Sequence, residues 1–402
     1  MEITEKEGLK LDNKVVVKKG TPAWKIAYQA IEDVFVDVAK GKRILIKPSI
    51  GRIGPAESAI CAHPEVIRGL IRFFLQKGAK EIFVGDGAIA GINEWEAMES
   101  AGITNICRQE GASTVDLDEY SPLIREIPSG VIVDSLKFTS FIDQVDLIIS
   151  VPVMKTHMYT TVTLSIKNMK GCLFKKEKTR LHRSIVEPPD RRKGLTLDYG
   201  IADMSEALLP DYAVIDGIVG MEGFGPSIGT PVYLDLVVAS KDPVAADLTA
   251  VELMGMKQDA IPHLNLTRER IGEALFGAIK VKPEDYMKFS RTFNLPTTEK
   301  FKEFFPNVSI VEKGSCSACS AAIMSFLKAH DHKLPKDFIY TLAAGKDLEL
   351  SELNRGCIFL IGNCAKGYKD EYGMDFCPGC PPVGSKILET IKERRSRDEL
   401  GS

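Results

Sequence analysis

The sequence lacks a large net charge of either sign and a long apolar segment. Its 52 Lys and Arg residues are nearly balanced by 55 Asp and Glu residues, which leaves a formal net charge of −3. This balance argues against a surface that binds nucleic acid, so no nucleic-acid partner is expected. The sequence contains no run of about 18 apolar residues, so we expect no membrane span.

Two further absences restrict the cofactor and the compartment. The glycines at 85, 87 and 91 miss the spacing of the dinucleotide-binding fingerprint, and no phosphate-binding Gly-Lys-Ser/Thr loop occurs. Residues 1–10 do not have the charged-then-apolar order of a secretory signal. We therefore expect a cytoplasmic, reduced protein, in which the nine cysteines serve in packing, metal binding or nucleophilic chemistry rather than in disulfides.

What the sequence does contain is a regular alternation of short apolar runs and amphipathic segments. It predicts strands at 14–18, 43–49, 81–87, 146–152, 212–218 and 232–240, and helices at 23–39, 64–78, 94–102 and 242–255. Asp242 and Pro243 suit the N-cap and the first position of the last helix. The alternation predicts an α/β fold with doubly wound sheets that are parallel or mixed.

A smaller α/β domain is predicted at the C-terminal end. Residues 256–306 are rich in charge and proline and are expected to form a helical connector. Strands at 307–311, 338–345 and 357–362 then alternate with helices at 317–330 and 384–395. We therefore predict a substrate-binding region at 1–300, built as one domain or two, and a separate domain at 305–396.

Five of the nine cysteines lie in this C-terminal domain: Cys316, Cys319, Cys364, Cys377 and Cys380. Cys316 and Cys319 begin a predicted helix, where positions three apart share a face and the N-terminus favours the thiolate. Because these cysteine loops follow strands of a parallel sheet, we expect them at its carboxyl edge.

Such a group of thiolates predicts a metal centre. The two C-x-x-C pairs, 316/319 and 377/380, favour tetrahedral zinc, whereas cysteines placed after strands of an α/β unit favour a [4Fe–4S] cluster over a zinc ribbon. We prefer the [4Fe–4S] cluster and keep zinc as the alternative. The scattered cysteines are assigned to packing: Cys61, Cys107, Cys172 and Cys357.

The cysteine pattern resembles the proximal-cluster site of nickel–iron hydrogenase small subunits and of the related complex I subunit. The shared features are a C-x-x-C, a Gly-x-Cys loop and a Gly-Cys-Pro-Pro segment, found here at 316–319, 362–364 and 379–382. The resemblance covers only residues 305–396. It implies Cys316, Cys319, Cys364 and Cys380 as cluster ligands and leaves Cys377 as an alternative ligand.

Polar residues mark the ends of the predicted strands in the larger region. Lys47, Asp86, Lys155 and Asp216 each lie at or just past the end of an apolar run, which is the ligand-binding edge of an open parallel sheet. His157 follows Lys155 by two residues, so both are expected to point from one loop into a cleft.

Proton transfer is assigned to histidines that lie among lysines. Nearby cations lower the pKa of an imidazole, which suits a neutral general base and favours His157 and His182. His63 is assigned to a helix start. The other three are placed at the surface or at helix ends: His263, His330 and His332.

Residues 167–193 carry ten Lys or Arg against three Asp or Glu. This excess fits a solvated loop or a mobile lid that attracts a carboxylate or a phosphate.

The larger region contains a set of short polar and glycine-containing segments at 47–49, 62–66, 85–87, 153–157, 165–171, 181–183, 215–223 and 240–245. By these segments it is similar to the domain-of-unknown-function family 362. This family is often associated with iron–sulfur domains and has no settled reaction. The order of elements is also distantly similar to the lactate racemase family. Within the matching segments we assign six residues to substrate binding: Lys47, Asp86, Lys167, Asn168, Asp216 and Glu222.

Three functions remain open. In the first, an oxidoreductase holds a small anionic substrate with Lys47, Lys155 and Lys167, exchanges electrons with the cluster, and moves the proton through His157 or His182. This reading is compatible with a redox partner such as ferredoxin and with a homo-oligomer. The second is a racemase-like enzyme with a structural cluster. The third is an electron carrier or assembly factor without its own substrate.

Overall fold

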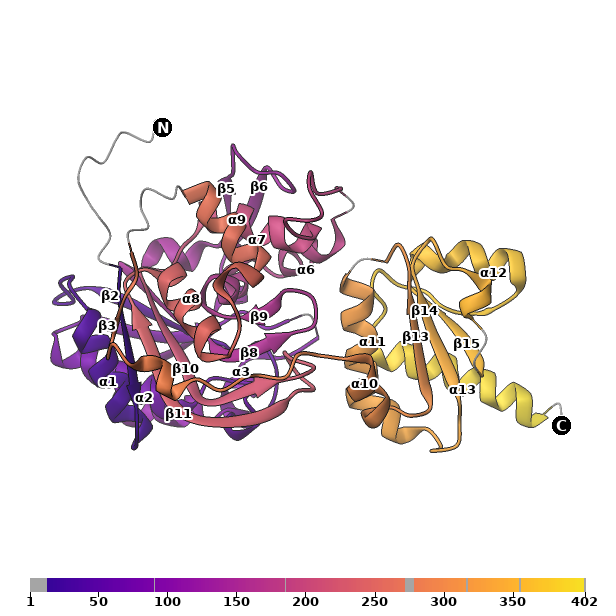
Figure 1. Ribbon diagram of the computed structural model, residues 1–402, viewed down its shortest axis with the longest axis horizontal. Coiled ribbons are helices and arrows are strands. Elements are labelled where there is room, and N and C mark those ends of the chain that lie inside the picture. The colour runs from indigo at the N-terminus through magenta and orange to yellow at the C-terminus, as the bar shows by residue number, and fades with distance from the viewer. Residues whose placement is uncertain are drawn as a thin grey trace. The chain divides into compact units, whose positions relative to one another are not determined.

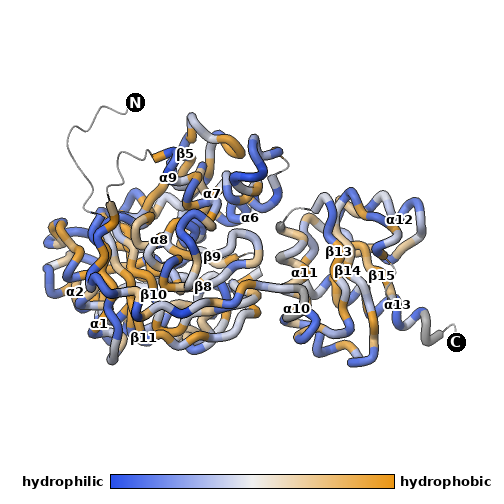
Figure 2. Tube along the Cα trace, in the orientation of Figure 1, coloured by the Kyte–Doolittle hydropathy of each residue, from blue (hydrophilic) through white to orange (hydrophobic). Residues whose placement is uncertain are grey.

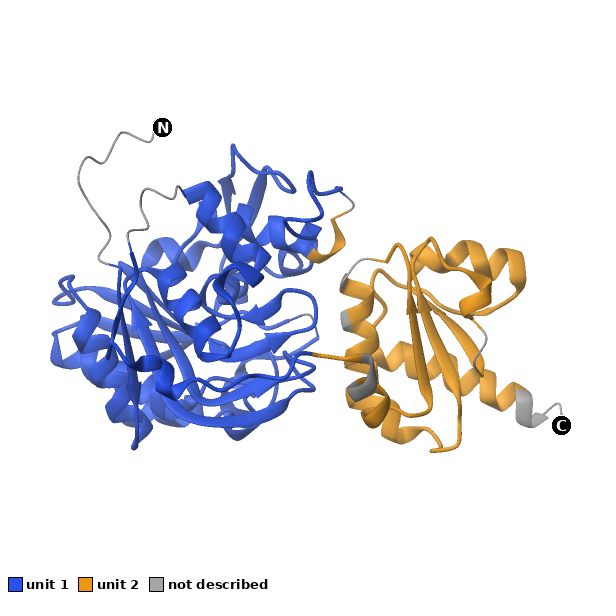
Figure 3. Cartoon of the chain, in the orientation of Figure 1, with its two compact units in different colours: residues 1–181, 186–295 blue, residues 182–185, 296–402 orange. Residues whose placement is uncertain are grey.

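The computed structural model describes residues 13–89, 91–184, 186–271, 278–315, 317–353 and 356–400. The chain divides into two compact units between Leu295 and Pro296 (Figure 3). Residues 182–185 are the exception, since they group with the second unit.

The first unit is built on a ten-stranded mixed sheet with the strand order β12-β1-β11-β10-β7-β2-β3-β4 and with β8 and β9 added beside β10 (Figure 1). Strands β2, β3, β4, β7 and β10 pair in parallel, and β11 runs antiparallel to both β10 and β1. The strands are β1 (Lys14–Lys19), β2 (Arg43–Pro48), β3 (Glu81–Asp86), β4 (Ser113–Asp116), β7 (Leu147–Val151), β8 (Val153–His157), β9 (Thr161–Thr163), β10 (Tyr212–Glu222), β11 (Thr230–Ser240) and β12 (Lys280–Lys282). A separate hairpin joins β5 (Pro122–Glu126) and β6 (Ser135–Thr139).

Helices cover both faces of this sheet, because its central strands carry apolar side chains on both sides. In β2, Leu45 packs into one core while Ile44 and Ile46 pack into the other, as the alternation of side chains along a strand requires. One face is covered by α1 (Ala23–Val34), α2 (Pro64–Gln76), α3 (Glu94–Ser100) and α4 (Ile103–Glu110). The other is covered by α5 (Ser165–Asn168), α7 (Thr196–Ala207), α8 (Pro243–Leu253) and α9 (Pro262–Ile271).

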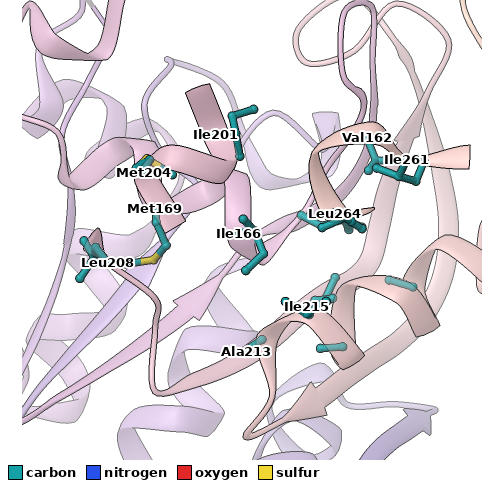
Figure 4. Close-up of a cluster of buried hydrophobic side chains, with 14 of the residues drawn as sticks. Val162, Ile166, Met169, Ile201, Met204, Leu208, Ala213, Ile215, Ile261 and Leu264 are labelled. Atoms are coloured by element: carbon teal, nitrogen blue, oxygen red, sulfur yellow. The ribbon is translucent and has the colours of Figure 1, made fainter. Parts of the chain in front are cut away.

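The packing on this second face is visible directly. Figure 4 shows Ile166 of α5, Ile201 of α7 and Leu264 of α9 gathered above Ile215 of β10. Figure 2 shows the hydrophobic residues concentrated along the strands inside each unit. In the described part of the chain, no helix has both the length and the apolar character needed to cross a membrane.

The second unit is a smaller parallel sheet with the order β13-β14-β15-β16. Phe326 of α11 packs edge-on against Tyr340 of β14 on one face, whereas Leu360 of β15 packs toward Ala365 and Tyr368 on the other. Its elements are α10 (Thr298–Phe304), β13 (Val308–Glu312), α11 (Ser317–His330), β14 (Tyr340–Ala344), β15 (Cys357–Ile361), α12 (Lys366–Tyr372), β16 (Asp375–Cys377) and α13 (Gly384–Leu400).

The predicted fold class, an α/β protein with a large mixed sheet and a smaller α/β unit, is confirmed. Asp242 caps α8 as predicted, since its carboxylate accepts from the amides of Val244 and Ala245 at 2.9 and 3.0 Å. The helix predicted at 23–39 is too long, because α1 ends at Val34. The connector prediction is also partly wrong, since 280–282 form β12 and pair with β1 in the main sheet.

Candidate functional site

Lys155 and His157 lie on a strand, β8, and not on the predicted loop. This strand pairs with β10 on one side and with β9 on the other. Because side chains two residues apart on a strand share a face, Lys155 and His157 project to the same side of the sheet. The sequence reading missed β8 because only Pro152 separates it from the apolar strand β7.

Lys47 is a buried lysine whose hydrogen-bonding capacity is used up within the protein. Its Nζ lies 2.7 Å from Asp86 Oδ1, 2.7 Å from the Asn168 carbonyl and 2.8 Å from Asn168 Oδ1, and the residue is 1% exposed. All three N–H groups therefore have acceptors. Gly171 permits this packing, because a Cβ there would collide with Asp86 Oδ1 and crowd Lys47 Nζ.

Asp86 is equally engaged. Its Oδ2 accepts from the amides of Ile50 and Gly51, at 3.0 and 3.3 Å, and its Oδ1 accepts from the amide of Gly87 at 2.8 Å. The structure thus brings together Lys47, Asp86 and Asn168, three residues predicted to bind substrate. It also joins them to one another, so that they hold α5 against the ends of β2 and β3.

Lys155 and Lys167 are buried lysines of a different kind. In the described part of the chain, each ammonium group has one hydrogen-bond acceptor: the Ile60 carbonyl at 2.7 Å from Lys155 Nζ, and Thr160 Oγ1 at 2.8 Å from Lys167 Nζ. The two residues are 2% and 7% exposed. Each ammonium therefore retains N–H groups that a ligand could use.

Further cations gather around these two lysines. Burial lowers the pKa of Lys155 to about 8 and that of Lys167 well below its usual value, and Lys170 and Arg52 lower the Lys167 pKa further. Burial also lowers the pKa of Lys170 to about 7. We call Arg52, Lys155, Lys167 and Lys170 the lysine cluster. Its electrostatics favour a bound anion, which would relieve the repulsion among these groups.

His157 is held in one orientation. Its Nδ1 accepts from the amides of Tyr159 and Thr160, at 3.1 and 3.3 Å. A neutral His157 therefore carries its proton on Nε2. His182, the second histidine predicted to transfer protons, is half-buried and belongs to residues 182–185, which group with the second unit. Of the two histidines, only His157 is part of the first unit.

Asp216 and Glu222, both predicted to bind substrate, hold backbone segments in place. Asp216 accepts from the amides of His63, at 2.6 Å, and Ile218, at 2.9 Å, and burial raises its pKa. Glu222 accepts from the amide and the side-chain Nδ2 of Asn294, at 2.9 and 2.8 Å. His63 starts α2 as predicted, with its Nδ1 accepting from the Glu65 amide.

The basic stretch 167–193 was predicted to be a loop. This prediction is wrong for much of the stretch, which is helical. It contains the end of α5, a short 3-10 helix at Met169–Cys172, and α6 (Glu177–Arg183). Lys178 is buried and donates to both carboxylate oxygens of Asp118, at 2.7 and 2.6 Å. Part of the positive charge is therefore neutralised within the protein.

Asp247 positions the start of α5 and was missed by the sequence reading. Its carboxylate accepts from the amides of Ser165 and Ile166, at 2.8 and 3.0 Å, and from Ser165 Oγ. Burial raises the Asp247 pKa to about 7. The available signal was a carboxylate within the apolar run at the start of the helix 243–253, whose other carboxylate, Glu252, lies near its end. By this contact α8 fixes the placement of Lys167.

The glycine-rich segment 217–229 lies against β8. Thr156 Oγ1 donates to the carbonyls of Gly223, at 2.9 Å, and Met221, at 3.3 Å. A Cβ at Gly225 would collide with the Thr156 carbonyl. The glycine at 225 therefore serves the close approach of two backbone segments beside His157.

A cavity of about 380 Å³ lies elsewhere in the first unit, along β1 and β12. Lys18 and Lys282 line it, and both are paired with carboxylates, Asp33 and Glu284. This cavity is separate from the lysine cluster.

In the second unit, two cysteine loops are joined at the carboxyl edge of the parallel sheet. Gly362 N donates to the Cys377 carbonyl at 3.0 Å, Asn363 N to the Gly379 carbonyl at 2.9 Å, and Gly379 N to Asn363 Oδ1 at 2.9 Å. Cys319 reaches the same place, because a Cβ on Gly362 would lie 2.7 Å from Cys319 Sγ.

The thiols themselves differ in exposure. Cys364 and Cys380 are exposed, whereas Cys319 and Cys377 are buried. Burial raises the pKa of Cys377, and its thiol is hydrogen-bonded to the side chain of Thr390 in α13. Cys316 lies outside the described residues. Within the described residues, no three His, Cys, Asp or Glu side chains are grouped closely enough to hold a metal ion. The backbone of these loops thus fits a thiolate-bound centre, while the described thiols are not gathered around one point.

Comparisons with known proteins show three similarities. Residues 44–252, just over half of the chain, match the family described as domain of unknown function DUF362. A thylakoid-associated protein from Synechocystis sp. is 25% identical over 243 residues, which cover 58% of this chain and 70% of that protein. The lactate racemase apoprotein from Thermoanaerobacterium thermosaccharolyticum aligns over 91% of this chain and 87% of its own, with 13% identity and a TM-score of 0.43. A structural similarity at this level says nothing about function.

Proposed function

This chain belongs to the DUF362 family, and from its own residues we propose that the first unit is an enzyme that binds a small anionic organic substrate at the lysine cluster. One observation carries this proposal: Lys47 has three acceptors, whereas Lys155 and Lys167 have one each in the described part of the chain. Buried ammonium groups with unused N–H groups are unfavourable unless a partner supplies acceptors. A carboxylate or a phosphate supplies both the acceptors and the opposite charge.

The same residues supply proton transfer. Lys155, with a pKa of about 8, changes protonation close to neutral pH, and His157 presents its Nε2 with a fixed tautomer. Both project from one face of β8. In this proposal Lys167 and Arg52 hold the anion, while Lys155 or His157 moves a proton. His182 stays a further candidate for this role.

We propose that the second unit holds a [4Fe–4S] cluster on Cys316, Cys319, Cys364 and Cys380, with zinc as the alternative. The hydrogen-bonded loops and the position of Cys319 Sγ against Gly362 support a shared centre. The hydrogen bond between Cys377 and Thr390 supports a ligand set that does not include Cys377. When bound, the cluster supplies one-electron transfer, which would make the chain an oxidoreductase served by a redox partner such as ferredoxin.

A second candidate function is a racemase-like or isomerase-like reaction, in which the cluster is structural. The pair of proton-transfer groups on β8, Lys155 and His157, favours it. The two functions differ in one measurement. Turnover of a substrate should stop when the cluster is held in one redox state if the chain is an oxidoreductase, and should continue if it is an isomerase.

The anion site can be tested before the substrate is known. Isothermal titration calorimetry of the anaerobically purified full chain, with oxalate and with inorganic phosphate at pH 7, should show binding of at least one anion. Lys155→Met and Lys167→Met should each weaken binding about tenfold or more. The matched control is Lys176→Met, at an exposed lysine of the same basic stretch. Equal binding by all variants, or binding of neither anion, would contradict the proposal.

A further inference from the structure

Glu94 is a buried carboxyl group without a partner. It is the first residue of α3, after the loop that follows β3, and it is 2% exposed. Neither Oε1 nor Oε2 has a hydrogen-bond partner among the described residues. No feature of the sequence singles it out, and none of the roles assigned above uses it.

The charges around Glu94 leave it no counterion. The carboxyl groups of Asp86 and Asp116 and the ammonium groups of Lys47 and Lys178 face it, and Cys61 is also within electrostatic range. Lys47 is already saturated by Asp86 and Asn168, and Lys178 is bound to both oxygens of Asp118.

Burial without a partner favours the neutral form of Glu94 at pH 7. An ionised carboxylate is strongly unfavourable where it is buried without donors or a free cation. Burial, together with the nearby carboxylate of Asp86, raises the Glu94 pKa to about 9. A neutral carboxyl carries an O–H, and no described residue accepts it.

The position of Glu94 relates it to the lysine cluster. Cys61 is within electrostatic range of Glu94, Lys155 and Arg52 at once. The Ile60 carbonyl beside Cys61 accepts from Lys155. The loop after β2, which contains Gly51 and Ile60, is joined to the loop after β3, because the Ile89 amide donates to the Gly51 carbonyl at 3.2 Å. Glu94 thus begins the helix after the loop that is bonded, through Ile89, to the segment whose Ile60 carbonyl binds Lys155.

We infer that Glu94 is the neutral acid of the anion site, and that its carboxyl O–H donates a hydrogen bond to an oxygen of the bound anion beside the ammonium groups of the lysine cluster. This inference rests on the proposed anion site and deepens it. The ligand is a carboxylate or a phosphate with an oxygen that accepts from a neutral acid.

Two substitutions separate a neutral donor from an ionised group. Glu94→Gln keeps the size of the side chain and an N–H donor, whereas Glu94→Leu removes the donor. In calorimetry at pH 7 with oxalate and inorganic phosphate, Glu94→Gln should bind within about threefold of the wild type, and Glu94→Leu should bind about tenfold more weakly or worse. Glu96→Gln, at an exposed glutamate of the same helix, should bind as the wild type does.

Infrared difference spectroscopy tests the proton itself. The wild type at pH 7 should show a protonated carboxylic acid band that Glu94→Gln lacks and Glu96→Gln keeps, and the bound anion should shift it. If the band is missing, Glu94 is ionised and the inference is overturned. The inference is also overturned if the band does not shift when the anion is present at a saturating concentration. Loss of binding in Glu94→Gln equal to that in Glu94→Leu also overturns it. If the band is present but neither anion binds, the proposed anion site fails and the donor role fails with it, while Glu94 remains protonated.

Discussion

The two units hold their reactive side chains in opposite ways. In the first unit Lys47, Lys155 and Lys167 are buried and are fixed by contacts with other side chains and carbonyls. In the second unit Cys364 and Cys380 are exposed on loops that are held by hydrogen bonds between backbone groups and one asparagine.

This difference teaches how far each site is organised before its ligand arrives. The lysine cluster is positioned by the protein, since a buried ionic group must be paired or held near its partners. A thiolate centre gains much of its geometry from the metal, because metal binding and local folding are coupled. The first site can therefore be tested by small anions, and the second by metal content.

The largest effect expected is the loss of iron from the second unit. After anaerobic purification, the wild type should contain about four irons and four sulfides per chain. Cys364→Ala or Cys380→Ala should lose more than half of the iron. Cys357→Ala, a half-buried cysteine assigned to packing, should keep it. Oxalate binding at the lysine cluster should be the same in all of these variants. If about one zinc per chain is found and no sulfide, the site holds a structural metal and the prediction of an iron–sulfur cluster is wrong.

The next largest effect concerns the saturated lysine of the first unit. Lys47→Met leaves the buried Asp86 carboxylate without its cation, so the free energy of unfolding should fall by about 3–5 kcal/mol. Lys42→Met, which removes an exposed ion pair with Asp146, should cost less than about 1 kcal/mol. The two tryptophans of the chain, Trp24 and Trp95, both lie in the first unit, so their fluorescence in urea follows that unit alone. Equal stability losses in the two variants would contradict the stabilising role of the buried Lys47–Asp86 ion pair.

Part of the site could be predicted from the sequence. Lys47 and Asp86 were found because parallel strands end at one edge of a sheet, so polar residues after apolar runs meet there. That rule predicts at which edge of the sheet a polar side chain lies, but not which groups it contacts there. Whether a lysine there binds protein acceptors or stays available depends on contacts with residues far away in the chain, such as Asn168 for Lys47 and Ile60 for Lys155.

Other residues could not be found because their environment is set entirely by tertiary packing. Glu94 follows a plain helix cap at Asn93, and nothing local marks it as buried. His263 was predicted at the surface or at a helix end. It does lie at the start of α9, but it is fully buried, with Nδ1 3.7 Å from Asp198 Oδ1, so the surface alternative is wrong. Burial of a single polar residue at the start of α9 leaves no periodic signal in the sequence.

A smaller effect should separate Glu94 from ordinary carboxylates. Its folded-state pKa of about 9 lies above its usual value of 4.5, so between these values the folded protein holds a proton that the unfolded chain has lost. The stability from this proton is complete below pH 4.5 and is lost as the pH rises through about 9. Glu94→Gln should therefore gain stability relative to the wild type with rising pH, by at most about 1.4 kcal/mol per pH unit. Urea unfolding at pH 6 and pH 8 measures the difference, and Glu96→Gln should show none.

The smallest effect expected is the pH dependence of anion binding, and it bears most directly on the contrast between available and saturated lysines. Lys155 has a folded-state pKa of about 8, and a bound anion raises that pKa because it favours the charged ammonium. Oxalate affinity should therefore fall about tenfold from pH 7 to pH 9 through Lys155 alone.

Because binding then restores the charge of a partly deprotonated lysine, it should take up protons near pH 8. Calorimetry in buffers of different ionisation enthalpy counts these protons, and Lys155→Met should lower the count, whereas Lys176→Met, at an exposed lysine, should not. Binding without proton uptake in the wild type would mean that Lys155 is as fully charged as a lysine saturated by protein acceptors, and the distinction between Lys155 and Lys47 would fail.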